Sequence, residues 1–138
     1  MTATYFVDTN IFLYAGSAEA TDAPKRERAI AILRKPGMGL SAQVMQEYYS
    51  VAFRKGRLGI TCEEALRSLH AMSKYPVVPV TSALVIDAVA ISERYRISYW
   101  DAAIVAAAHV LECEVIYSED LQHGQAYGAV RIVNPFMD

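Results

Sequence analysis

Residues 5–15 read YFVDTNIFLYA, and this stretch decides the fold. The run Tyr5-Phe6-Val7 has the aromatic and β-branched composition of a buried strand. Residues 11–15 form a plausible helix directly after it, and Asp8-Thr9-Asn10 lies between the two, in the position of a helix cap. A strand that passes at once into a helix is the repeating unit of α/β folds.

The same alternation continues along the chain. Further strands are predicted at residues 38–40, 77–80, 115–117 and 130–133. Start and stop signals predict helices at residues 24–34, from Ser41 to Lys55 with Gly56 as the stop, from Thr61 to about Lys74, from Thr81 or Ser82 to near Arg94, and at 102–111. Strands joined through helices imply right-handed crossovers and a sheet covered on both faces. We therefore predict an α/β fold, a three-layer α/β/α sandwich around a central, mostly parallel five-stranded sheet.

Length and composition favour one folded domain. The chain has 138 residues, of which 54% are hydrophobic and 20% charged, so it can bury a full core and is not a disordered or collagen-like sequence. We predict a single domain over residues 1–138. The longest apolar stretch, at 102–111, is shorter than the roughly 18 residues of a membrane-spanning helix, and the N-terminus lacks the pattern of a signal peptide. The expectation is a protein of the cytoplasm without a membrane segment.

Net charge and cysteine content exclude other classes. The formal net charge of −2 argues against an architectural protein that binds nucleic acid tightly, but it is compatible with an enzyme that contacts nucleic acid transiently. Cys62 and Cys113 are far apart and have no zinc-ligand spacing. The local basic groups, each typical of a solvated helix end, are residues 25–28, 34–35, 54–57 and 94–96.

Acidic residues follow two of the predicted strands. Asp8 comes directly after residues 5–7, and Asp120 follows residues 115–119. Ligands of parallel sheets bind beyond the carboxyl ends of the strands, so both carboxylates fall at one edge if these strands are neighbours. Asp8 alone has an equally simple explanation as a helix cap, which stays open at this point.

Two further acids belong to predicted helices with apolar faces. Glu47 shares a helix face with Val44 and Tyr48, where a carboxylate needs either a basic partner or a polar site at the rim of the core. Asp101 opens the most apolar helix, and its spacing from Ser98 is that of a capping box. For Asp101, too, the capping alternative stays open.

Taken together, the four acids predict a metal site. Four carboxylates packed into one pocket repel one another and need cations to neutralise them. Oxygen ligands select hard cations, Mg²⁺ or Mn²⁺, which usually contact a phosphate substrate. Such a site activates water and stabilises charge on a phosphodiester. Asp8, Glu47, Asp101 and Asp120 therefore predict hydrolytic phosphoryl transfer.

Other chemistries lack support in the sequence. It contains neither GxGxxG after a strand nor GxxxxGK[ST], and no GxSxG nucleophile elbow. An aspartyl phosphatase would need a second carboxylate where Asn10 stands. The three histidines share no metal spacing, and His123, close to Asp120, is left as a candidate for substrate contact.

Five segments spread over essentially the whole chain carry a resemblance to a known family. They are Val7-Asp8-Thr9-Asn10-Ile11-Phe12, Glu47 within its helix, Tyr99-Trp100-Asp101-Ala102, residues 117–125 (YSEDLQHGQ), and Asn134-Pro135-Phe136. In this order and spacing they resemble the PIN-domain family, and specifically its VapC-type ribonuclease toxins. All four acidic positions of the family pattern are filled, so the resemblance indicates an active enzyme.

The resemblance implies an endoribonuclease that depends on Mg²⁺, or alternatively Mn²⁺, and hydrolyses RNA phosphodiesters. In such proteins Asp8, Asp101 and Asp120 would hold the metal. Glu47 would assist directly or through water. Hydrogen bonds from two further residues would support these carboxylates, namely Asn10 and Ser118.

The resemblance also implies partners. The protein would be the toxin of a VapBC-type toxin–antitoxin pair, inhibited by a VapB-like antitoxin, and such toxins are often homodimers. The apolar residues Met45, Tyr49 and Phe53 offer a possible dimer face. An antitoxin could lay an apolar helix near residues 9–15 and 44–53 and send an Arg or Lys into the acidic pocket.

Two other functions stay open from the sequence. One is a different nuclease on the same scaffold, which matures ribosomal RNA or cuts DNA flaps, and the lack of a neighbouring antitoxin-like reading frame would favour it. The other is a non-catalytic module that binds RNA or acts as a scaffold. Metal-dependent cleavage would exclude this second alternative.

Overall fold

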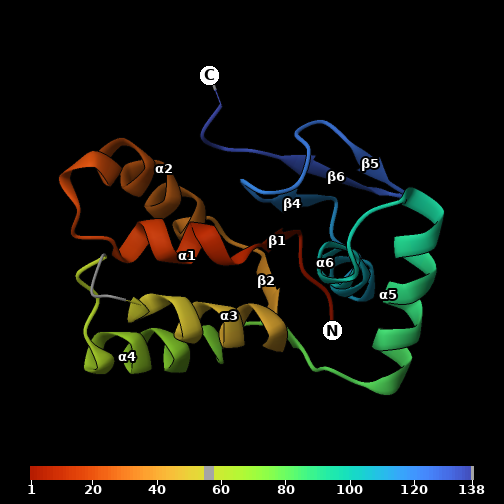
Figure 1. Ribbon diagram of the computed structural model, residues 1–138, viewed down its shortest axis with the longest axis horizontal. Coiled ribbons are helices and arrows are strands. Elements are labelled where there is room, and N and C mark those ends of the chain that lie inside the picture. Colours follow the sequence, from red (N-terminus) through yellow and green to blue (C-terminus); the bar gives the residue numbers. More distant parts are fainter. Residues whose placement is uncertain (55–57, 138) are drawn as a thin grey trace.

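A computed structural model describes residues 1–54 and 58–137, in which strands and helices alternate (Figure 1). The strands are β1 (Tyr5–Val7), β2 (Met38–Ser41), β3 (Val77–Val78), β4 (Val115–Tyr117), β5 (Ala126–Tyr127) and β6 (Val130–Val133). The helices are α1 (Thr9–Gly16), α2 (Ala23–Arg34), α3 (Ala42–Ala52), α4 (Cys62–Met72), α5 (Ser82–Tyr95) and α6 (Tyr99–Val110), and a 3₁₀ turn, η1, spans Ala20–Asp22.

The strands form one sheet in the order β3-β2-β1-β4-β6-β5. Neighbouring strands are parallel, except that β5 runs antiparallel to β6. β1 lies between β2 and β4, so the two halves of the sheet diverge at β1. Open α/β sheets bind ligands beyond the carboxyl end of the strand at such a switch point.

Two groups of helices flank the sheet. Helix α1 packs against α2 and α3, and α3 packs against α4, while α5 packs against α6, which also contacts β2 and β6. Figure 1 shows α1–α4 on one side of the strands and α5 and α6 on the other. The predicted α/β fold with a mostly parallel sheet between helices is confirmed.

Side-chain caps begin four of the helices where the sequence predicted them. In each case a hydroxyl oxygen accepts a hydrogen bond from the backbone N–H three residues further on. The four capping residues are Ser41, Thr61, Thr81 and Ser98.

The core is centred on α6 and the middle strands. Residues 102–108 of α6 are all buried, as the apolar sequence predicted. Gly39 of β2 lies close to the end of this helix, because a Cβ there would stand 2.6 Å from Leu111 Cδ1. No helix within the described residues has the length and apolar character needed to cross a membrane.

The sheet differs from the prediction in two places. It has six strands rather than five, because residues 126–127 add a short antiparallel strand at the edge. The predicted strand at 77–80 ends at Val78, directly before Pro79, which has no N–H to donate to a ladder.

Helix boundaries differ as well. Helix α3 ends at Ala52 rather than at Lys55; the predicted stop at Gly56, like Lys55 itself, lies outside the described residues. Helix α6 begins at Tyr99, which places Asp101 in its first turn. Tyr95, the last residue of α5, precedes Arg96, whose φ of 57° is left-handed and ends the helix.

Candidate active site

Asp8 occupies the switch point at the carboxyl end of β1. Its side chain is only 7% exposed. Its Oδ1 accepts a hydrogen bond from the backbone N–H of Thr9 at 2.7 Å, and its Oδ2 accepts one from the Ser118 hydroxyl at 2.8 Å. Asp8 is therefore the N-cap of α1 and also a carboxylate fixed at the ligand-binding edge, so the two interpretations of this residue are compatible.

Ser118 links Asp8 to the loop that follows β4. The side chain is fully buried. While it donates to Asp8, its oxygen accepts the backbone N–H groups of Asp120 and Leu121, each at 3.2 Å. The orientation of Asp8 and the path of the Asp120 loop are thus fixed by one hydroxyl group.

Burial and neighbouring charges both disfavour the ionised form of Asp8. Desolvation is the largest cause and raises the pKa of this carboxyl to about 6, against an ordinary value near 3.8. The hydrogen bonds from Ser118 and Thr9 oppose the shift, and the negative charges of Glu47 and Asp120 add to it. At neutral pH, Asp8 is therefore a carboxylate held in unfavourable surroundings.

Glu47 reaches the same edge from α3. Its Oε2 accepts a hydrogen bond from the Thr9 hydroxyl at 2.8 Å, and its Oε1 accepts one from Gln43 Nε2 at 2.9 Å. Both carboxylate oxygens are thus held by neutral donors, and the side chain is half-buried at the rim of the core. Of the two explanations that the sequence left for Glu47, the polar site agrees with this geometry.

Asp120 and Asp101 complete the acidic edge. Asp120 Oδ2 accepts a hydrogen bond from Asn10 Nδ2 at 3.0 Å. Partial burial raises the pKa of Asp120, and the charges of Glu119, Asp101 and Glu47 raise it further, while the Asn10 hydrogen bond lowers it. Asp101 lies in the first turn of α6.

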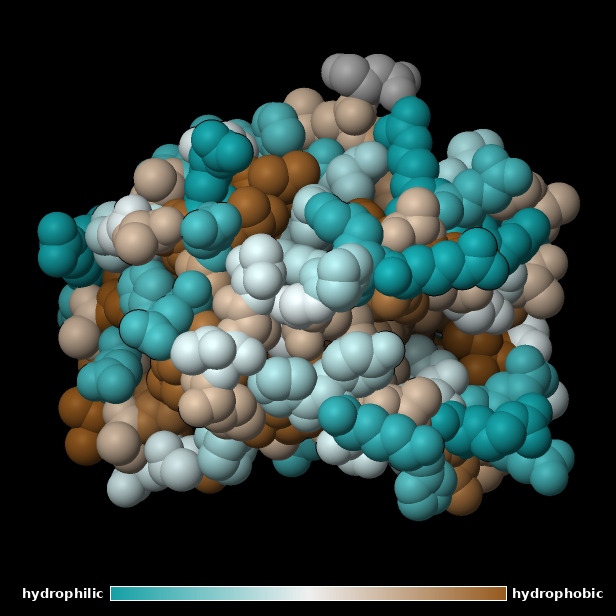
Figure 2. All heavy atoms as spheres, turned by 180° about the vertical axis from the view of Figure 1, so that it is seen from behind, coloured by the Kyte–Doolittle hydropathy of each residue, from teal (hydrophilic) through white to brown (hydrophobic). Residues whose placement is uncertain are grey.

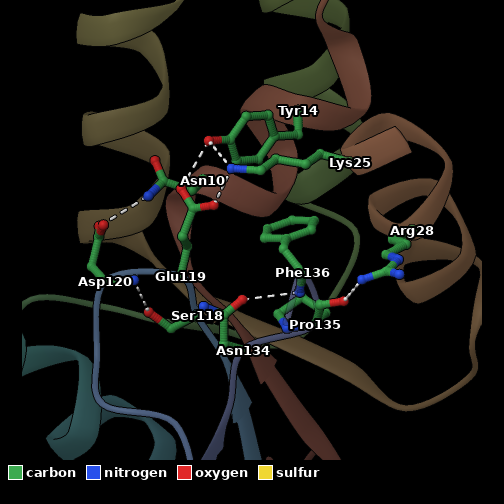
Figure 3. Close-up of polar contacts among 10 residues, drawn as sticks. All are labelled: Asn10, Tyr14, Lys25, Arg28, Ser118, Glu119, Asp120, Asn134, Pro135 and Phe136. Atoms are coloured by element: carbon green, nitrogen blue, oxygen red, sulfur yellow. Dashed lines mark hydrogen bonds and ion pairs between the residues drawn. The ribbon is translucent and has the colours of Figure 1, made fainter. Parts of the chain in front are cut away.

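A second network anchors the Asp120 loop to α1 and α2 (Figure 3). Glu119 accepts hydrogen bonds from the Tyr14 hydroxyl at 2.8 Å and from Lys25 Nζ at 2.5 Å, and Lys25 also donates to the Tyr14 oxygen at 3.2 Å. Phe136 packs edge-to-face on the Tyr14 ring, with a centroid distance of 5.1 Å. This network holds the residue directly before Asp120.

The predicted site residues lie at or just after the carboxyl ends of β1 and β4, on α3, and in the first turns of α1 and α6. Direct hydrogen bonds join Asp8 to Ser118 and Asp120 to Asn10, and electrostatic effects on the pKa values of Asp8 and Asp120 connect the four acids. Sequence reasoning missed the second layer of contacts, because side chains that touch only in the folded chain leave no spacing signal. These residues are Thr9, Tyr14, Lys25, Gln43 and Glu119.

The donor set fits a hard divalent cation in its chemistry, since every candidate ligand is a carboxylate oxygen. Within residues 1–54 and 58–137, however, no three His, Cys, Asp or Glu side chains converge closely enough to hold one ion as they stand. The carboxylates are near enough to raise one another's pKa values without sharing a ligand geometry.

His123 makes its side-chain hydrogen bond with the segment after β6. Its Nδ1 accepts a hydrogen bond from the backbone N–H of Asn134 at 2.9 Å, which ties the loop after β4 to the segment after β6. The contact gives His123 a role in holding two chain segments together.

Comparison with models of protein families gives a match over most of the chain. The model of the PIN domain family matches residues 5–128 of the chain. A comparison with curated proteins finds no match.

Several solved structures share the fold. A toxin–antitoxin complex from Klebsiella pneumoniae superposes with a TM-score of 0.70 at 18% identity, over 96% of this chain and 98% of that one. VapC20 of Mycobacterium tuberculosis is described as a toxin that cleaves the sarcin–ricin loop. It superposes with a TM-score of 0.67 at 21% identity, over 85% of this chain and 90% of that one. FitAcB of Neisseria gonorrhoeae superposes with a TM-score of 0.65 at 17% identity, over 96% of this chain and 98% of that one.

Proposed function

The chain belongs to the PIN domain family, and from this premise we propose that it is a divalent-cation-dependent endoribonuclease, the toxin of a VapBC-type toxin–antitoxin pair. The observation that carries the proposal is the position of Asp8. This carboxyl is almost fully buried at the switch point, where Glu47 and Asp120 add negative charge. Such an arrangement destabilises a fold unless a bound cation compensates it.

The residues that would hold Mg²⁺ or Mn²⁺ are Asp8, Asp101 and Asp120, with Glu47 assisting directly or through water. When bound, a divalent cation neutralises charge on a phosphodiester and activates water. The chain itself contributes orientation. Ser118 fixes the Asp8 carboxylate and Asn10 fixes that of Asp120. Thr9 and Gln43 do the same for Glu47.

RNA is the substrate class that the structural relatives support. VapC20 is described as a toxin that cleaves the sarcin–ricin loop, and another relative comes from a toxin–antitoxin complex. We expect the purified chain to cleave single-stranded RNA in Mg²⁺ or Mn²⁺ and to stop when EDTA is added. Gel analysis of labelled RNA, with single-stranded DNA and a DNA flap as parallel substrates, measures this. Cleavage of the DNA flap alone would favour the alternative nuclease, and RNA binding without cleavage in either cation would contradict the enzyme.

The antitoxin proposal rests on an apolar cavity between α1, α3 and α4, on the side of the sheet where β2 begins. This cavity of about 270 Å³ is lined by residues of α1, α2, β2, α3 and α4 together with Tyr75. Phe12 and Ala15 belong to the predicted landing segment 9–15, and Tyr48 belongs to 44–53. An amphipathic antitoxin helix could bury its apolar face here and send an Arg to the carboxylates.

Co-expression tests this partner. We expect the chain alone to suppress growth, and the product of the adjacent upstream reading frame to restore it. Replacing the half-buried Ala15 by Glu should weaken the pair, because it places a charge at the wall of the apolar cavity. Pull-down of the tagged antitoxin measures the loss, with Leu66→Glu on the exposed face of α4 as the matched control. Growth that is not restored by the upstream product would contradict the proposed pair.

A homodimer stays a prediction. Of the three residues proposed for its face, Tyr49 is exposed, whereas Met45 and Phe53 pack against the core. Helix α5 exposes a larger apolar set, formed by Val85, Ile86 and Val89. Figure 2 shows hydrophobic side chains gathered at the end of the molecule where α5 lies, so α5 is the better candidate for contact between copies.

A further inference from the structure

Trp100 is the most exposed aromatic side chain among the described residues. It is 65% exposed, against 46% for Tyr49 and 42% for Tyr75. It is also the only tryptophan of the chain. The exposed aromatic face is therefore available for another flat molecule to stack on.

The position of Trp100 connects it to the acidic edge. It directly precedes Asp101 in the first turn of α6. The Gln43 amide that donates to Glu47 Oε1 at 2.9 Å also donates to the Trp100 carbonyl oxygen at 3.4 Å. Tyr99 packs edge-to-face against the Trp100 ring, with a centroid distance of 5.0 Å and an angle of 80°. Gln43 thus ties the Trp100 backbone to the rim of the carboxylate cluster, and Tyr99 packs against the ring.

From these contacts we propose that Trp100 is the platform on which a nucleobase of single-stranded RNA stacks, next to the phosphate to be cleaved. The inference rests on the proposed function and adds a binding residue to it. Unpaired RNA bases present flat π-faces that stack on aromatic side chains with little dependence on sequence. A base held at Trp100 places the neighbouring phosphate beside Asp101 and Glu47.

The site is negatively charged, so an uncharged stacking contact with a base matters for binding RNA. Asp8, Glu47, Asp101 and Asp120 repel a phosphate backbone wherever a cation does not compensate them, and the whole chain is negative, at −2. Proteins that neutralise phosphates with Lys and Arg lose affinity steeply as salt rises. Stacking does not depend on salt in this way, so it suits an acidic surface that must hold a polyanion.

Trp100→Ala and Trp100→Phe test the platform. Binding of a short, labelled, single-stranded RNA is measured by fluorescence anisotropy in the Asp8→Asn background with Mg²⁺, so that the strand stays intact. We expect Trp100→Ala to weaken binding about tenfold at both low and high salt, and Trp100→Phe to restore most of it. Tyr75→Ala, at the opposite edge of the sheet before β3, is the matched exposed-aromatic control and should bind as the parent does.

The single tryptophan gives a second readout. Its fluorescence should be quenched by the RNA but not by a strand of the same length with abasic positions. Unchanged fluorescence at saturating RNA, together with unaltered binding by Trp100→Ala, would overturn the platform even if wild type cleaves RNA. Quenching without cleavage would support stacking while the nuclease proposal fails. A Trp100→Ala protein that changes its sedimentation but binds RNA normally would assign the ring to a protein contact and overturn the inference.

Discussion

Replacing Asp8 by Asn should lower RNA cleavage by about a hundredfold or more while the protein still folds. The carboxylate is expected to hold the cation, and the amide that replaces it has one oxygen and no charge. Asn is as good a helix cap as Asp, and its oxygen can still accept the Thr9 N–H that Asp8 accepts. Cleavage rates and thermal melts of the same samples measure the two effects separately. Glu47→Gln, Asp101→Asn and Asp120→Asn should show the same pattern.

Mg²⁺ or Mn²⁺ provides the control for this prediction. Because a ligand that binds only the native state stabilises it, either ion should raise the melting temperature of wild type, and the rise should shrink in each variant. Asp87→Asn, on an exposed position of α5, is the matched carboxylate control and should keep both activity and the response to cations. If Asp8→Asn retained full cleavage, the acids would be helix caps and the catalytic proposal would fail.

The fold could be predicted from the sequence because local signals and long-range pairing agree. Hydroxyl caps at Ser41, Thr61, Thr81 and Ser98 begin helices where the hydrophobic pattern also begins. The edge strand at residues 126–127 could not be predicted, since two residues are too few for any alternation to appear. Its position depends on pairing with β6, where Tyr127 lies opposite Val130.

The acids of the candidate site could be predicted from the sequence, but the residues that hydrogen-bond to acidic side chains there could not. Asp8 follows β1 directly and Asp120 lies in the loop after β4, behind Ser118 and Glu119, so chain direction alone brings them to one edge. Lys25 belongs to a basic run typical of a solvated helix end, yet it pairs with Glu119, 94 residues away in the sequence. No pattern within residues 25–28 indicates that partner, because the contact depends on how α2 packs beside the loop after β4. Gln43 and Thr9 were missed for the same reason.

Free of cations, the protein should lose stability as pH rises from about 4 to about 6, and Asp8 should account for much of the loss. Its pKa is about 6 in the folded chain and near 3.8 when unperturbed, with burial as the main cause. Between these values the native state binds more protons than the unfolded state, so the free energy of unfolding falls with rising pH. A pKa shift of this size corresponds to a change of about 3 kcal/mol in the free energy of unfolding. Urea unfolding of EDTA-treated protein across this pH range measures the fall.

Asp8→Asn should remove that fall and make the cation-free protein more stable than wild type at neutral pH. The variant keeps the Thr9 hydrogen bond, but its Nδ2 group meets a Ser118 oxygen that already accepts from Asp120 and Leu121, at a cost of about 1 kcal/mol. The gain from removing the buried charge exceeds this cost, so a net stabilisation remains at pH 7. The charges that face Asp8 are those of Glu47 and Asp120, and both persist in the variant. For Asp87→Asn, the free energy of unfolding should depend on pH as it does in wild type. An Asp8→Asn curve parallel to wild type from pH 4 to pH 7 would mean that this carboxyl is not strained in the fold, and the principal reason for expecting a cation beside it would disappear.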